Sequence, residues 1–523
     1  MKLACRVHAA VVVTTCLRRL ASASFALVLV ACGGSSTAPA PQASSSDIAV
    51  GAAVPGPTPF ISVLPLSGQS LKQVSIYRFL IAPKPGTVSR PVDVRYSAAA
   101  MARRGFHADG SSSANLPVFG LYAGHANQVT LEMTFGDGSR QEKVVTITTP
   151  PYVDPAGIFD HPTILQARAS GGPSLNYALL RSVSAGPIVV DSDAQVRWTA
   201  PGTFNGRGVV LRDNALFLAG QTSLDFYRIE LDGALTKMLI PAQAPSNPQA
   251  QFDHFHHSLD RSRSGILGEL DGVVDGIPSI ESMIVDLSLA GAILKDWDMA
   301  AIVRKQMRDN GDDPALFVRP GSDWFHMNAT TYDARDNSVI VSSRENFVIK
   351  IDYASGAIKW ILGDPTKYWY TFPSLRAKAL TLEAGGLYPV GQHAVSIASD
   401  GSLLLFNNGT PSVSQPAGAP LGEKRLYSVV SAYDIDPVKM TAREIWNFDY
   451  GKTILSDICS SVYEVPGGGY LLSYAAANNR TRARIVGIDS RREVLFDFDY
   501  PSPGVCETSF SAEPIGLDKL TIQ

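Results

Sequence analysis

The feature that most constrains the fold of this chain is a short pattern that recurs along it. In each copy an apolar run leads to an aspartate beside a turn, and a second run closes on a large side chain, most often tryptophan. The clearest copy extends from Asp352 through Gly356 to Trp360. Six copies follow one another at spacings of roughly 40–90 residues, as expected for a chain built from repeated units. The copies close at Trp198, Met238, Trp297, Trp360, Trp446 and Phe496.

Each copy has the pattern of a β-hairpin, and a second hairpin lies between copies. One of these second hairpins turns at Asp400-Gly401, just before the apolar run Leu403–Leu405. Four short strands per repeat and six repeats predict an all-β chain organised as a six-bladed β-propeller. A β-solenoid would have shorter and more even repeats, and a β-sandwich would not repeat the terminal tryptophan.

The residues that precede the repeats have a different pattern. Val129–Phe135 and Lys143–Thr148 alternate apolar and polar side chains on either side of the turn Gly136–Gly138. This alternation is typical of an antiparallel hairpin. We therefore predict a small β-sandwich-like domain over residues 58–150. Pro150-Pro151 marks its boundary with the propeller, which is predicted to occupy residues 151–523.

The N-terminal segment has the pattern of a lipoprotein leader. Arg18-Arg19 precedes the apolar stretch Leu20–Ala31, which is too short for an ordinary membrane span. Leu29–Cys32 resembles a lipobox, so we expect residues 1–31 to be removed and Cys32 to carry a lipid. An ordinary signal peptide that is cleaved nearby is the alternative. Residues 32–57, rich in Ser, Ala, Pro and Gly, are expected to form a flexible tether.

Cysteine usage and charge agree with an exported protein. Cys459 and Cys506 are the two cysteines that remain outside the leader and the lipobox. In an oxidising compartment such a pair is expected to form a disulfide, although two buried free thiols remain an alternative. A net charge of −3 argues against a nucleic-acid partner. We expect a periplasmic protein that is anchored to a membrane by lipid, and Gly33 after the lipidated cysteine favours the outer membrane.

Three of the nine histidines occupy one position in the repeats. His257 and His393 each stand eight residues before the turn glycine of a hairpin, Gly265 and Gly401. His326 reaches the turn of its own hairpin three residues later. Because the innermost strands of a propeller line a central channel, we expect these three imidazoles to converge near its mouth.

Other side chains are expected to share this site. Asn328 follows His326 by two residues, so on a strand the two side chains would share a face. Arg344 closes the next strand, and Ser461 has the same register in the last complete hairpin. The remaining histidines of the folded part are interpreted as structural: His107, His125, His161, His254 and His256.

Three histidines suit two chemistries. One is a zinc site with three imidazole ligands and an open position. The other is an anion site in which imidazoles act as nucleophile, acid and hydrogen-bond donor while an arginine binds oxygen atoms. Arg344 and Asn328 favour the anion site, because an arginine would repel a divalent cation. No carboxylate in these segments is an obvious metal ligand, so neither a metal nor another cofactor is expected.

Six segments of the chain share a resemblance to one family: Leu116–Tyr122, Asn127–Thr130, Trp324–Asn328, Val341–Arg344, Ile349–Gly363 and Gly391–His393. They resemble the bacterial arylsulfate sulfotransferase family. The resemblance covers roughly residues 58–515 and implies a periplasmic six-bladed propeller with a small N-terminal β domain.

The resemblance also implies a reaction. An aryl sulfate would transfer its sulfuryl group to His393, and the resulting sulfohistidine would pass the group to a phenolic acceptor with ping-pong kinetics, without an adenylyl-sulfate donor. His257, His326, Asn328 and Arg344 match sulfate-binding and acid/base positions of the family. Which of His257 and His326 is the acid/base stays open.

This chain departs from the family pattern in places. Ser258 and Ala394 follow two of the histidines where relatives often have an acidic residue, and Ser461 or Ser460 is the nearest match to a sulfate-binding threonine. A sulfatase or phosphatase, a non-catalytic binding module and a metal-dependent hydrolase or lyase remain alternatives. The physiological substrates and the oligomeric state, a homodimer included, also stay open.

Overall fold

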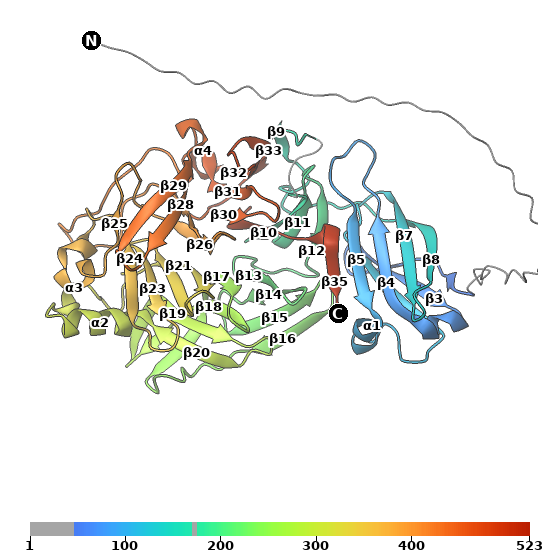
Figure 1. Cartoon of the computed structure of the whole chain (residues 1–523), viewed down its shortest axis with the longest axis horizontal. Coiled ribbons are helices and arrows are strands. Elements are labelled where there is room, and N and C mark those ends of the chain that lie inside the picture. The colour runs from blue at the N-terminus through green and yellow to red at the C-terminus, as the bar shows by residue number, and fades with distance from the viewer. Residues whose placement is uncertain (1–46, 170–174) are drawn as a thin grey trace, which may run out of the picture. The chain divides into compact units, whose positions relative to one another are not determined.

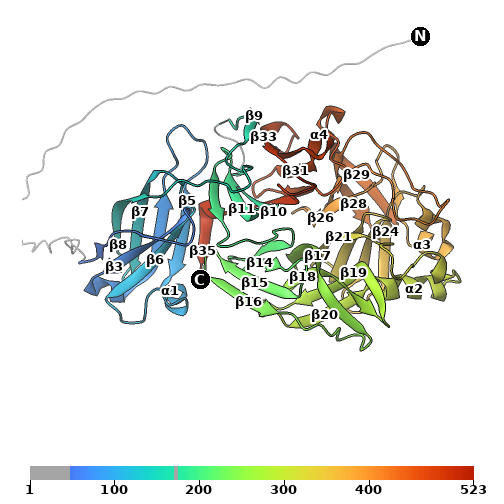
Figure 2. The ribbon, with the colours of Figure 1, turned by 180° about the vertical axis from the view of Figure 1, so that it is seen from behind.

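The computed structural model of the chain describes residues 47–169 and 175–523. Within these residues the protein is built mainly of β-sheets (Figures 1 and 2). The expected leader, the expected lipidation site Cys32 and the expected tether up to residue 46 lie outside the described residues. Among the described residues, no helix combines the length and the apolar character that a membrane crossing requires.

Residues 163–514 of the described chain form six sheets of four or five strands, each made mostly of consecutive antiparallel strands (Figure 1). The first three sheets contain β10 (Tyr177–Ser182), β11 (Gly186–Asp191) and β12 (Val196–Thr199); β13 (Val209–Arg212), β14 (Ala215–Ala219), β15 (Asp225–Glu230) and β16 (Leu235–Leu239); and β17 (Ala250–Arg261), β18 (Ile266–Val274), β19 (Ile277–Leu287) and β20 (Ile293–Asp298). The next two contain β21 (Met327–Asp333), β22 (Ser338–Ser343), β23 (Val348–Asp352) and β24 (Ile358–Leu362); and β25 (Thr381–Leu382), β26 (His393–Ile397), β27 (Leu403–Asn407), β28 (Val429–Asp436) and β29 (Thr441–Phe448). The sixth contains β30 (Ser461–Glu464), β31 (Tyr470–Ala476), β32 (Arg482–Ile488) and β33 (Val494–Pro501).

The innermost strands of successive sheets contact one another, which produces the β-propeller that the repeats predict. β34 (Ser511–Pro514) closes the arrangement, because it pairs with β10 in the first sheet and contacts β30 in the sixth. A second link comes from β9 (Thr163–Gln166), which adds an outer strand to β33. The last strand of the propeller segment thus pairs in the first sheet, and its first strand pairs in the sixth sheet.

The repeated closing residues occupy one structural position. Every one of them lies in the fourth strand of its sheet: β12, β16, β20, β24, β29 and β33. Trp198 is fully buried and its indole Nε1–H donates to the carbonyl oxygen of Leu231, which connects the first sheet to the second. Trp297 makes the same kind of bond to Tyr353 between the third and fourth sheets. The repeated tryptophan therefore joins neighbouring sheets.

The N-terminal domain is a pair of packed sheets whose core is continuous with buried residues of the first two propeller sheets. One sheet contains β1 (Ala49–Val50), β2 (Val54–Pro55), β3 (Ile61–Ser67) and β6 (Ser113–Phe119); the other contains β4 (Val74–Ile81), β5 (Val92–Ser97), β7 (Ala126–Phe135) and β8 (Arg140–Thr148). The predicted hairpin is formed by β7 and β8. A short helix, α1 (Ala98–Arg103), follows β5 and begins at Ser97, whose hydroxyl accepts from the Ala100 backbone N–H.

Two boundaries differ from the expected ones. Ile48 is buried in the core of the N-terminal domain and β1 pairs with β3, so residues 47–57 belong to this domain rather than to a tether. At the other end of the chain, β35 (Leu520–Ile522) pairs with β5 of the N-terminal domain (Figure 1). The sequence pattern misses these segments because strands of two or three residues are too short to show a period.

Two further features support the propeller. Helix α2 (Met299–Asp309) begins at Asp298, whose carboxylate accepts from the Ala301 N–H, and it buries Met299, Val303 and Met307. The expected disulfide is confirmed: Cys459 and Cys506 are bonded, and together with Phe510 they form a small apolar cluster next to the innermost strands.

Candidate active site

The three histidines in register lie where the innermost strands of three consecutive sheets begin or bend. His257 lies in β17, His326 directly precedes β21, and His393 is the first residue of β26. The pairing of each inner strand with its neighbour shifts register at this point, which marks a β-bulge. The backbone φ angle is +26° at His257, +48° at His326 and +49° at Ala394. Bulges and positive φ angles turn side chains away from the regular strand direction and are common beside active sites.

This geometry brings the imidazoles together. The ring centroids of His257 and His326 are 5.2 Å apart. His393 lies close enough to both rings for a charge on either one to affect its neighbour's pKa. His257 and His393 are buried, and His326 exposes 12% of its side chain. The predicted convergence of the three histidines is therefore observed.

The hydrogen bonds of His393 determine which ring nitrogen holds the proton. Its Nδ1 is 2.6 Å from Oδ1 of Asn408 and 3.2 Å from the carbonyl oxygen of Gly391. Asn408 in turn donates from Nδ2 to the carbonyl oxygens of Ser456 and Cys459, which fixes the orientation of its amide. Because both partners of Nδ1 can only accept, Nδ1 carries the proton and Nε2 holds a lone pair.

His393 is neutral at ordinary pH. Burial, together with the charges of Arg344 and His326, lowers its pKa to about 3, although the bonds to Asn408 and Gly391 act in the opposite direction. Its Nε2 is buried and has no hydrogen-bond partner. Gly391 permits this arrangement, because its φ is +60° and a Cβ there would lie 2.4 Å from Oγ1 of Thr410.

His326 has the opposite character. Burial alone lowers its pKa, but hydrogen bonds to Asp323 and Glu281 and the charge of Glu281 raise the value to about 9. Nδ1 lies 2.6 Å from a carboxylate oxygen of Asp323 and 2.7 Å from one of Glu281. The ring is therefore charged at neutral pH, and its Nε2–H is a buried donor without a partner.

Glu281 and His256 join this cluster, although the sequence pattern does not identify them. The carboxylate of Glu281 forms ion pairs with both imidazoles: one oxygen lies 2.6 Å from Nε2 of His256 and the other lies 2.7 Å from Nδ1 of His326. Burial raises the pKa of Glu281, but the two imidazoles lower it to about 2, so it remains a carboxylate. The sequence pattern gives little reason to assign Glu281 to this site, because Glu281 lies in β19 and only the fold brings it to the histidines.

The carboxylate of Glu281 also determines the tautomer of His257. His256 donates its Nε2–H to Glu281, so its Nδ1 can accept from Nδ1 of His257, with which it is in close contact. Burial lowers the pKa of His257 well below its usual value, and the charges of His326 and Arg207 lower it further. A neutral His257 with its proton on Nδ1 presents the lone pair of Nε2.

Arg344 and Asn328 complete the group of unpaired polar atoms. Nε of Arg344 and Oδ1 of Asn328 are buried without a hydrogen-bond partner, as are Nε2 of His326 and Nε2 of His393. Unpaired buried polar atoms are rare in native structures, so a cluster of them indicates a place where a ligand binds. Three of these atoms are suited to binding an anion or attacking an electrophile: two cationic N–H donors and one imidazole lone pair.

The backbone and side chain of Arg344 are held in place by several contacts. Its backbone N–H donates to the carbonyl oxygen of His326 at 3.0 Å, and its Nη2 donates to Glu345 at 2.7 Å. Lys367 is fully buried and donates to the carbonyl oxygens of Arg344 and Glu345, each at 3.1 Å. Burial lowers the pKa of Lys367 to about 8. The guanidinium is thus fixed while its Nε remains available.

Asn328 and Ser461 are both expected to share the anion site, and the structure places them differently. The backbone bulge includes Asn328, so strict strand alternation with His326 does not apply; the amide donates to the carbonyl oxygen of Gln392 at 2.8 Å. The hydroxyl of Ser461 donates to the carbonyl oxygen of Ala512 and accepts from its N–H, which joins β30 to β34. Ser460 bonds to Ser456 and to the Ala475 N–H. The structure thus uses both serine hydroxyls within the fold.

Arg207 is a further cation at this place that the sequence reading does not single out. It precedes β13, just as His326 precedes β21, and its guanidinium lies 5.6 Å from the ring of Phe510. Its charge lowers the pKa of His257, and its own Nε is buried without a partner. Its position shortly before an innermost strand is the feature of the sequence that could have identified Arg207 as a site residue.

The cluster also contains atoms that could bind a divalent cation. His256, His257 and Glu281 form one such group, and Glu281, Asp323 and His326 form another. The sequence shows no obvious carboxylate ligand because Glu281 comes from a distant strand, and Asp323 approaches His326 only through the turn before β21. The charges of Arg207 and Arg344, which act on His257 and His326, oppose a dication, so we interpret these contacts as ion pairs and hydrogen bonds.

Comparisons with known proteins identify the family of this chain. The family description "Arylsulfotransferase (ASST)" matches residues 166–510, and "Arylsulfotransferase Ig-like domain" matches residues 85–150. Arylsulfate sulfotransferase AssT of Escherichia coli O6:H1 (strain CFT073) is 31% identical over 225 residues, which are 40% of this chain and 33% of that protein. AssT of Lelliottia amnigena is 23% identical over 453 residues, covering 67% of this chain and 73% of that protein.

Solved structures give weaker similarities. The β-propeller domain of Myceliophteria thermophila Cps50 (Swd1) has a TM-score of 0.33 at 13% identity, covering 64% of this chain and 89% of that one. A europium-containing methanol dehydrogenase has a TM-score of 0.32 at 10% identity, covering 72% and 76%. The family match alone spans most of the propeller and includes all three converging histidines. This chain belongs to the arylsulfotransferase (ASST) family.

Proposed function

We propose that this protein transfers a sulfuryl group from an aryl sulfate ester to a phenolic acceptor through a covalent intermediate on His393. The observation that carries the proposal is the buried, unpaired Nε2 of a neutral imidazole beside two cationic donors, His326 and Arg344. Sulfuryl transfer resembles phosphoryl transfer in needing mainly positioning and stabilisation of charge on the peripheral oxygens. These are the properties that the site supplies.

In the first half-reaction the lone pair of His393 Nε2 attacks the sulfur atom. The N–S bond forms as the bond between sulfur and the aryl oxygen breaks, and the electron pair of that bond leaves with the phenolate. Arg344 would bind the sulfuryl oxygens through its free Nε–H, and Asn328 would position the donor. The Nδ1–H of His393 remains bonded to Asn408, which stabilises the positive charge that develops on the ring.

His326 is the better candidate for the acid/base. Its pKa of about 9 keeps it protonated at neutral pH and lies close to the value of about 10 for a phenol. Its Nε2–H can therefore pass to the leaving phenolate and be regained from the acceptor phenol. His257 is neutral, and its Nε2 lone pair would accept a hydrogen bond from the acceptor hydroxyl or from a protonated neighbouring side chain.

In the second half-reaction an acceptor phenol loses its proton to His326 and attacks the sulfur of sulfohistidine. The N–S bond breaks, and the electron pair returns to His393. No nucleotide takes part, since the donor ester already carries an activated sulfuryl group. One covalent intermediate shared by two substrates predicts ping-pong kinetics.

The test of this function is acceptor dependence. Release of nitrophenol from p-nitrophenyl sulfate is followed with and without phenol, and phenyl sulfate is measured in the same samples. The proposal predicts nitrophenol release that rises with phenol and matches the phenyl sulfate formed. Equal release without phenol, with free sulfate as product, would identify a sulfatase.

A second experiment tests the role of His326. Nitrophenolate leaves readily without a proton, whereas unsubstituted phenolate does not. His326→Gln should therefore lose more rate with phenyl sulfate than with p-nitrophenyl sulfate as donor. Equal losses with both donors would mean that His326 only binds the sulfate.

We also propose that the protein is exported and held at a membrane by a lipid on Cys32. The lipobox-like Leu29–Cys32 motif supports this, and so does the Cys459–Cys506 disulfide, which is typical of oxidising compartments. Labelling with a radioactive fatty acid should mark the wild type but not Cys32→Ser. Labelling of both forms would contradict this anchor.

A further inference from the structure

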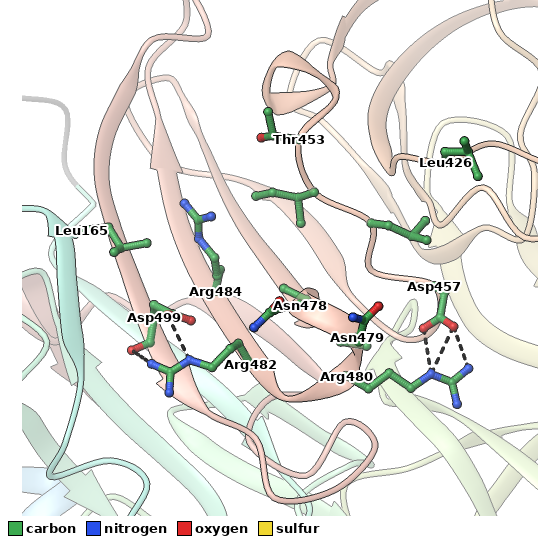
Figure 3. A pocket seen from close by; sticks show the side chains of 14 residues that line it. Leu165, Leu426, Thr453, Asp457, Asn478, Asn479, Arg480, Arg482, Arg484 and Asp499 are labelled. Atoms are coloured by element: carbon green, nitrogen blue, oxygen red, sulfur yellow. Dashed lines mark hydrogen bonds and ion pairs between the residues drawn. The ribbon is translucent and has the colours of Figure 1, made fainter.

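A partly buried guanidinium normally has a carboxylate partner, and the pocket on the sixth sheet shows this ordinary case. Arg480 binds Asp457 through Nε and Nη2. Arg482 binds Asp499 on the opposite side of the pocket (Figure 3). Side chains that are paired in this way need no ligand to balance their charge. One arginine at the candidate active site differs from them.

Arg207 has no carboxylate partner among the described residues. Burial lowers the pKa of its guanidinium, whereas the charge of Glu281 raises it without a hydrogen bond between the two side chains. Nε of Arg207 is buried and unpaired. Taking a cation out of water without pairing it costs free energy, and unpaired buried polar atoms are rare in native structures. Arg207 is therefore placed to bind an anion that the protein itself does not supply.

Arg207 occupies the same position in its sheet as the histidines do in theirs. The residues at the beginning or the bulge of the six innermost strands, or shortly before them, are in sheet order Phe510, Arg207, His257, His326, His393 and Ser460. Neighbouring innermost strands contact one another. Arg207 belongs to the second sheet and His393 to the fifth of these six sheets. The two side chains therefore approach the centre of the propeller from opposite sides.

Phe510 connects Arg207 to the histidines. The guanidinium carbon of Arg207 lies 5.6 Å from the centre of the Phe510 ring, and the ring of His257 lies 5.6 Å from the same ring. The backbone of Phe510 is fixed, because its N–H donates to the carbonyl oxygen of Arg181 at 2.8 Å and its carbonyl oxygen accepts from the Ser460 N–H at 3.1 Å. A cation, an aromatic ring and a neutral imidazole thus lie together across from His393.

A second free donor lies near Arg207. Nε2 of Gln221 is buried without a hydrogen-bond partner. A Cβ added to Gly208 would lie 3.0 Å from this nitrogen and 3.5 Å from the carbonyl oxygen of His257. The absence of a side chain at Gly208 therefore leaves space for the amide beside the backbone that carries Arg207. A guanidinium and an amide N–H are donors that suit a carboxylate.

In the proposed reaction the aryl ring points toward this side of the site. Nε2 of His393 attacks sulfur, and the aryl oxygen leaves roughly in line on the far side of the sulfur atom. The ring attached to that oxygen therefore extends away from His393, toward the sheets that carry Phe510, Arg207 and His257. Arg344 would hold the sulfuryl oxygens from the fourth sheet, so Arg207 meets the ring and its substituents.

We propose that Arg207 binds an anionic substituent on the aromatic ring of the donor and the acceptor, so that the protein selects aryl sulfates and phenols that carry a carboxylate. The proposal rests on the proposed function for the placement of the sulfuryl group at His393. Phe510 packs against the aromatic ring, and Gln221 donates a further hydrogen bond to the carboxylate. Arg207 determines specificity and takes no part in breaking or forming the bonds to sulfur.

The experiment is a calorimetric titration of the full chain with two aryl sulfonates, 4-sulfobenzoate and 4-carbamoylbenzenesulfonate. Neither has an aryl ester oxygen, so neither is turned over, and they differ mainly in the charge of the group opposite the sulfonate. The wild type should bind 4-sulfobenzoate about tenfold or more tightly than the amide. Arg207→Gln should bind the two with about equal affinity, because the variant has no charge to distinguish them.

Two further variants serve as controls. Arg212→Gln removes a charge from the other end of β13 and should keep the preference for 4-sulfobenzoate, which separates a contact at Arg207 from general attraction of a dianion. Arg207→Lys keeps the charge and should keep most of the preference. The guanidinium of Arg207 holds no carboxylate of the described residues, so thermal unfolding of both Arg207 variants should match the wild type.

The same preference should appear in turnover. With p-nitrophenyl sulfate as donor, kcat/KM is measured for 4-hydroxybenzoate and for 4-hydroxybenzamide as acceptors. The ratio of the two values should fall about tenfold in Arg207→Gln. Comparison of this ratio between wild type and variant cancels the different intrinsic reactivities of the two phenols.

Three results would overturn the assignment of Arg207. The first is equal affinity of the wild type for the two sulfonates. The second is a preference for 4-sulfobenzoate that persists in Arg207→Gln. The third is an equal weakening of both sulfonates in Arg207→Gln, which would place Arg207 on the sulfonate group. Failure of the proposed function is recognised separately, as a wild type that prefers 4-sulfobenzoate yet transfers no sulfuryl group to any phenol.

Discussion

His326 directly precedes the innermost strand of one sheet and His393 begins that of the next, yet at neutral pH the His326 ring is charged and the His393 ring is neutral. His393 faces an amide and a carbonyl oxygen, and its pKa is about 3. His326 faces two carboxylates, and its pKa is about 9. Both rings are largely buried, so burial does not explain the difference. The partner of Nδ1 decides whether a repeated histidine is neutral or protonated at neutral pH.

This contrast predicts a division of labour that mutations can break. A substitution that removes the neutral ring should abolish transfer. A substitution that places a carboxylate beside His393 should raise the pKa of His393. A substitution that removes a carboxylate from His326 should lower the pKa of His326. The expected effects follow in order of decreasing size.

The largest effect is expected for His393→Ala. Removing the proposed nucleophile should lower kcat/KM for p-nitrophenyl sulfate by about 10⁴-fold or more, because the proposed covalent intermediate could not form. Steady-state release of nitrophenol in the presence of phenol measures this. His161→Ala removes an exposed histidine and should have no effect. A His393→Ala protein within tenfold of the wild type would rule out His393 as the nucleophile.

A smaller loss is expected for Arg344→Ala. The variant loses the free Nε–H that we propose binds sulfuryl oxygens, and removal of one such donor typically costs about 10²–10³-fold in rate. The measurement is kcat with saturating phenol. Arg335→Ala, on the hairpin turn of the same sheet, is the matched control and should stay near the wild-type rate. An unchanged kcat in Arg344→Ala would place sulfate binding elsewhere.

The contrast can be reversed in part with Asn408→Asp. A carboxylate 2.6 Å from Nδ1 would raise the pKa of His393, so a larger fraction of the ring would be protonated and unable to attack. At pH 6 we expect a loss of about 10- to 100-fold in kcat/KM, and partial recovery as the pH rises. The pH profile is the readout. Asn447→Asp on β29 introduces the same charge on an exposed residue and should not change the profile.

Sequence alone predicts the fold because the repeated closing residue has one structural role. Each copy ends in the fourth strand of a sheet, where its large side chain packs between sheets, as Trp198 does. The histidine register is readable for the same reason, since equivalent strand positions meet at the centre. Short strands such as β1 and β35 escape prediction because they have no period.

The sequence cannot give the charge states. Glu281 is separated from His326 by 45 positions along the chain, and only the bend of β19 brings its carboxylate to the ring. Asn408 reaches His393 from the residue after β27, held by carbonyl oxygens of the disulfide loop. His256 looks structural in the sequence, yet it connects Glu281 to His257. These roles depend on contacts between sheets that no local pattern records.

A change in the other histidine's environment should have a moderate effect. Glu281→Gln removes one of the two carboxylates that raise the pKa of His326, so the loss of activity with rising pH, expected near pH 9 in the wild type, should begin about one unit lower. The profile of kcat/KM for phenyl sulfate measures it. Asp275→Asn, at the tip of the same hairpin, is the control. An unshifted basic limb would mean that His326 is not the acid.

The smallest effect on rate is expected for the double variant Cys459→Ser/Cys506→Ser. The disulfide closes a loop of 47 residues, so its loss should reduce the free energy of unfolding by about 2–4 kcal/mol. Because the Cys459 carbonyl oxygen helps hold Asn408, kcat should also fall a few-fold. Thermal unfolding and steady-state rates of the purified variant check both. A stable variant with a large loss of kcat would indicate that the disulfide acts directly on His393.

The most direct test of the central claim is to trap the intermediate. Wild-type protein is mixed with p-nitrophenyl sulfate without acceptor and then quenched in alkali. Alkali preserves the N–S bond of a sulfohistidine, which resembles the N–P bond of a phosphoramidate, better than acid does. Peptides of the quenched protein are analysed by mass spectrometry. We predict a burst of nitrophenol equal to the enzyme and a sulfuryl adduct on the peptide that contains His393. A burst with an adduct on another residue, or turnover without any adduct, would contradict transfer through His393.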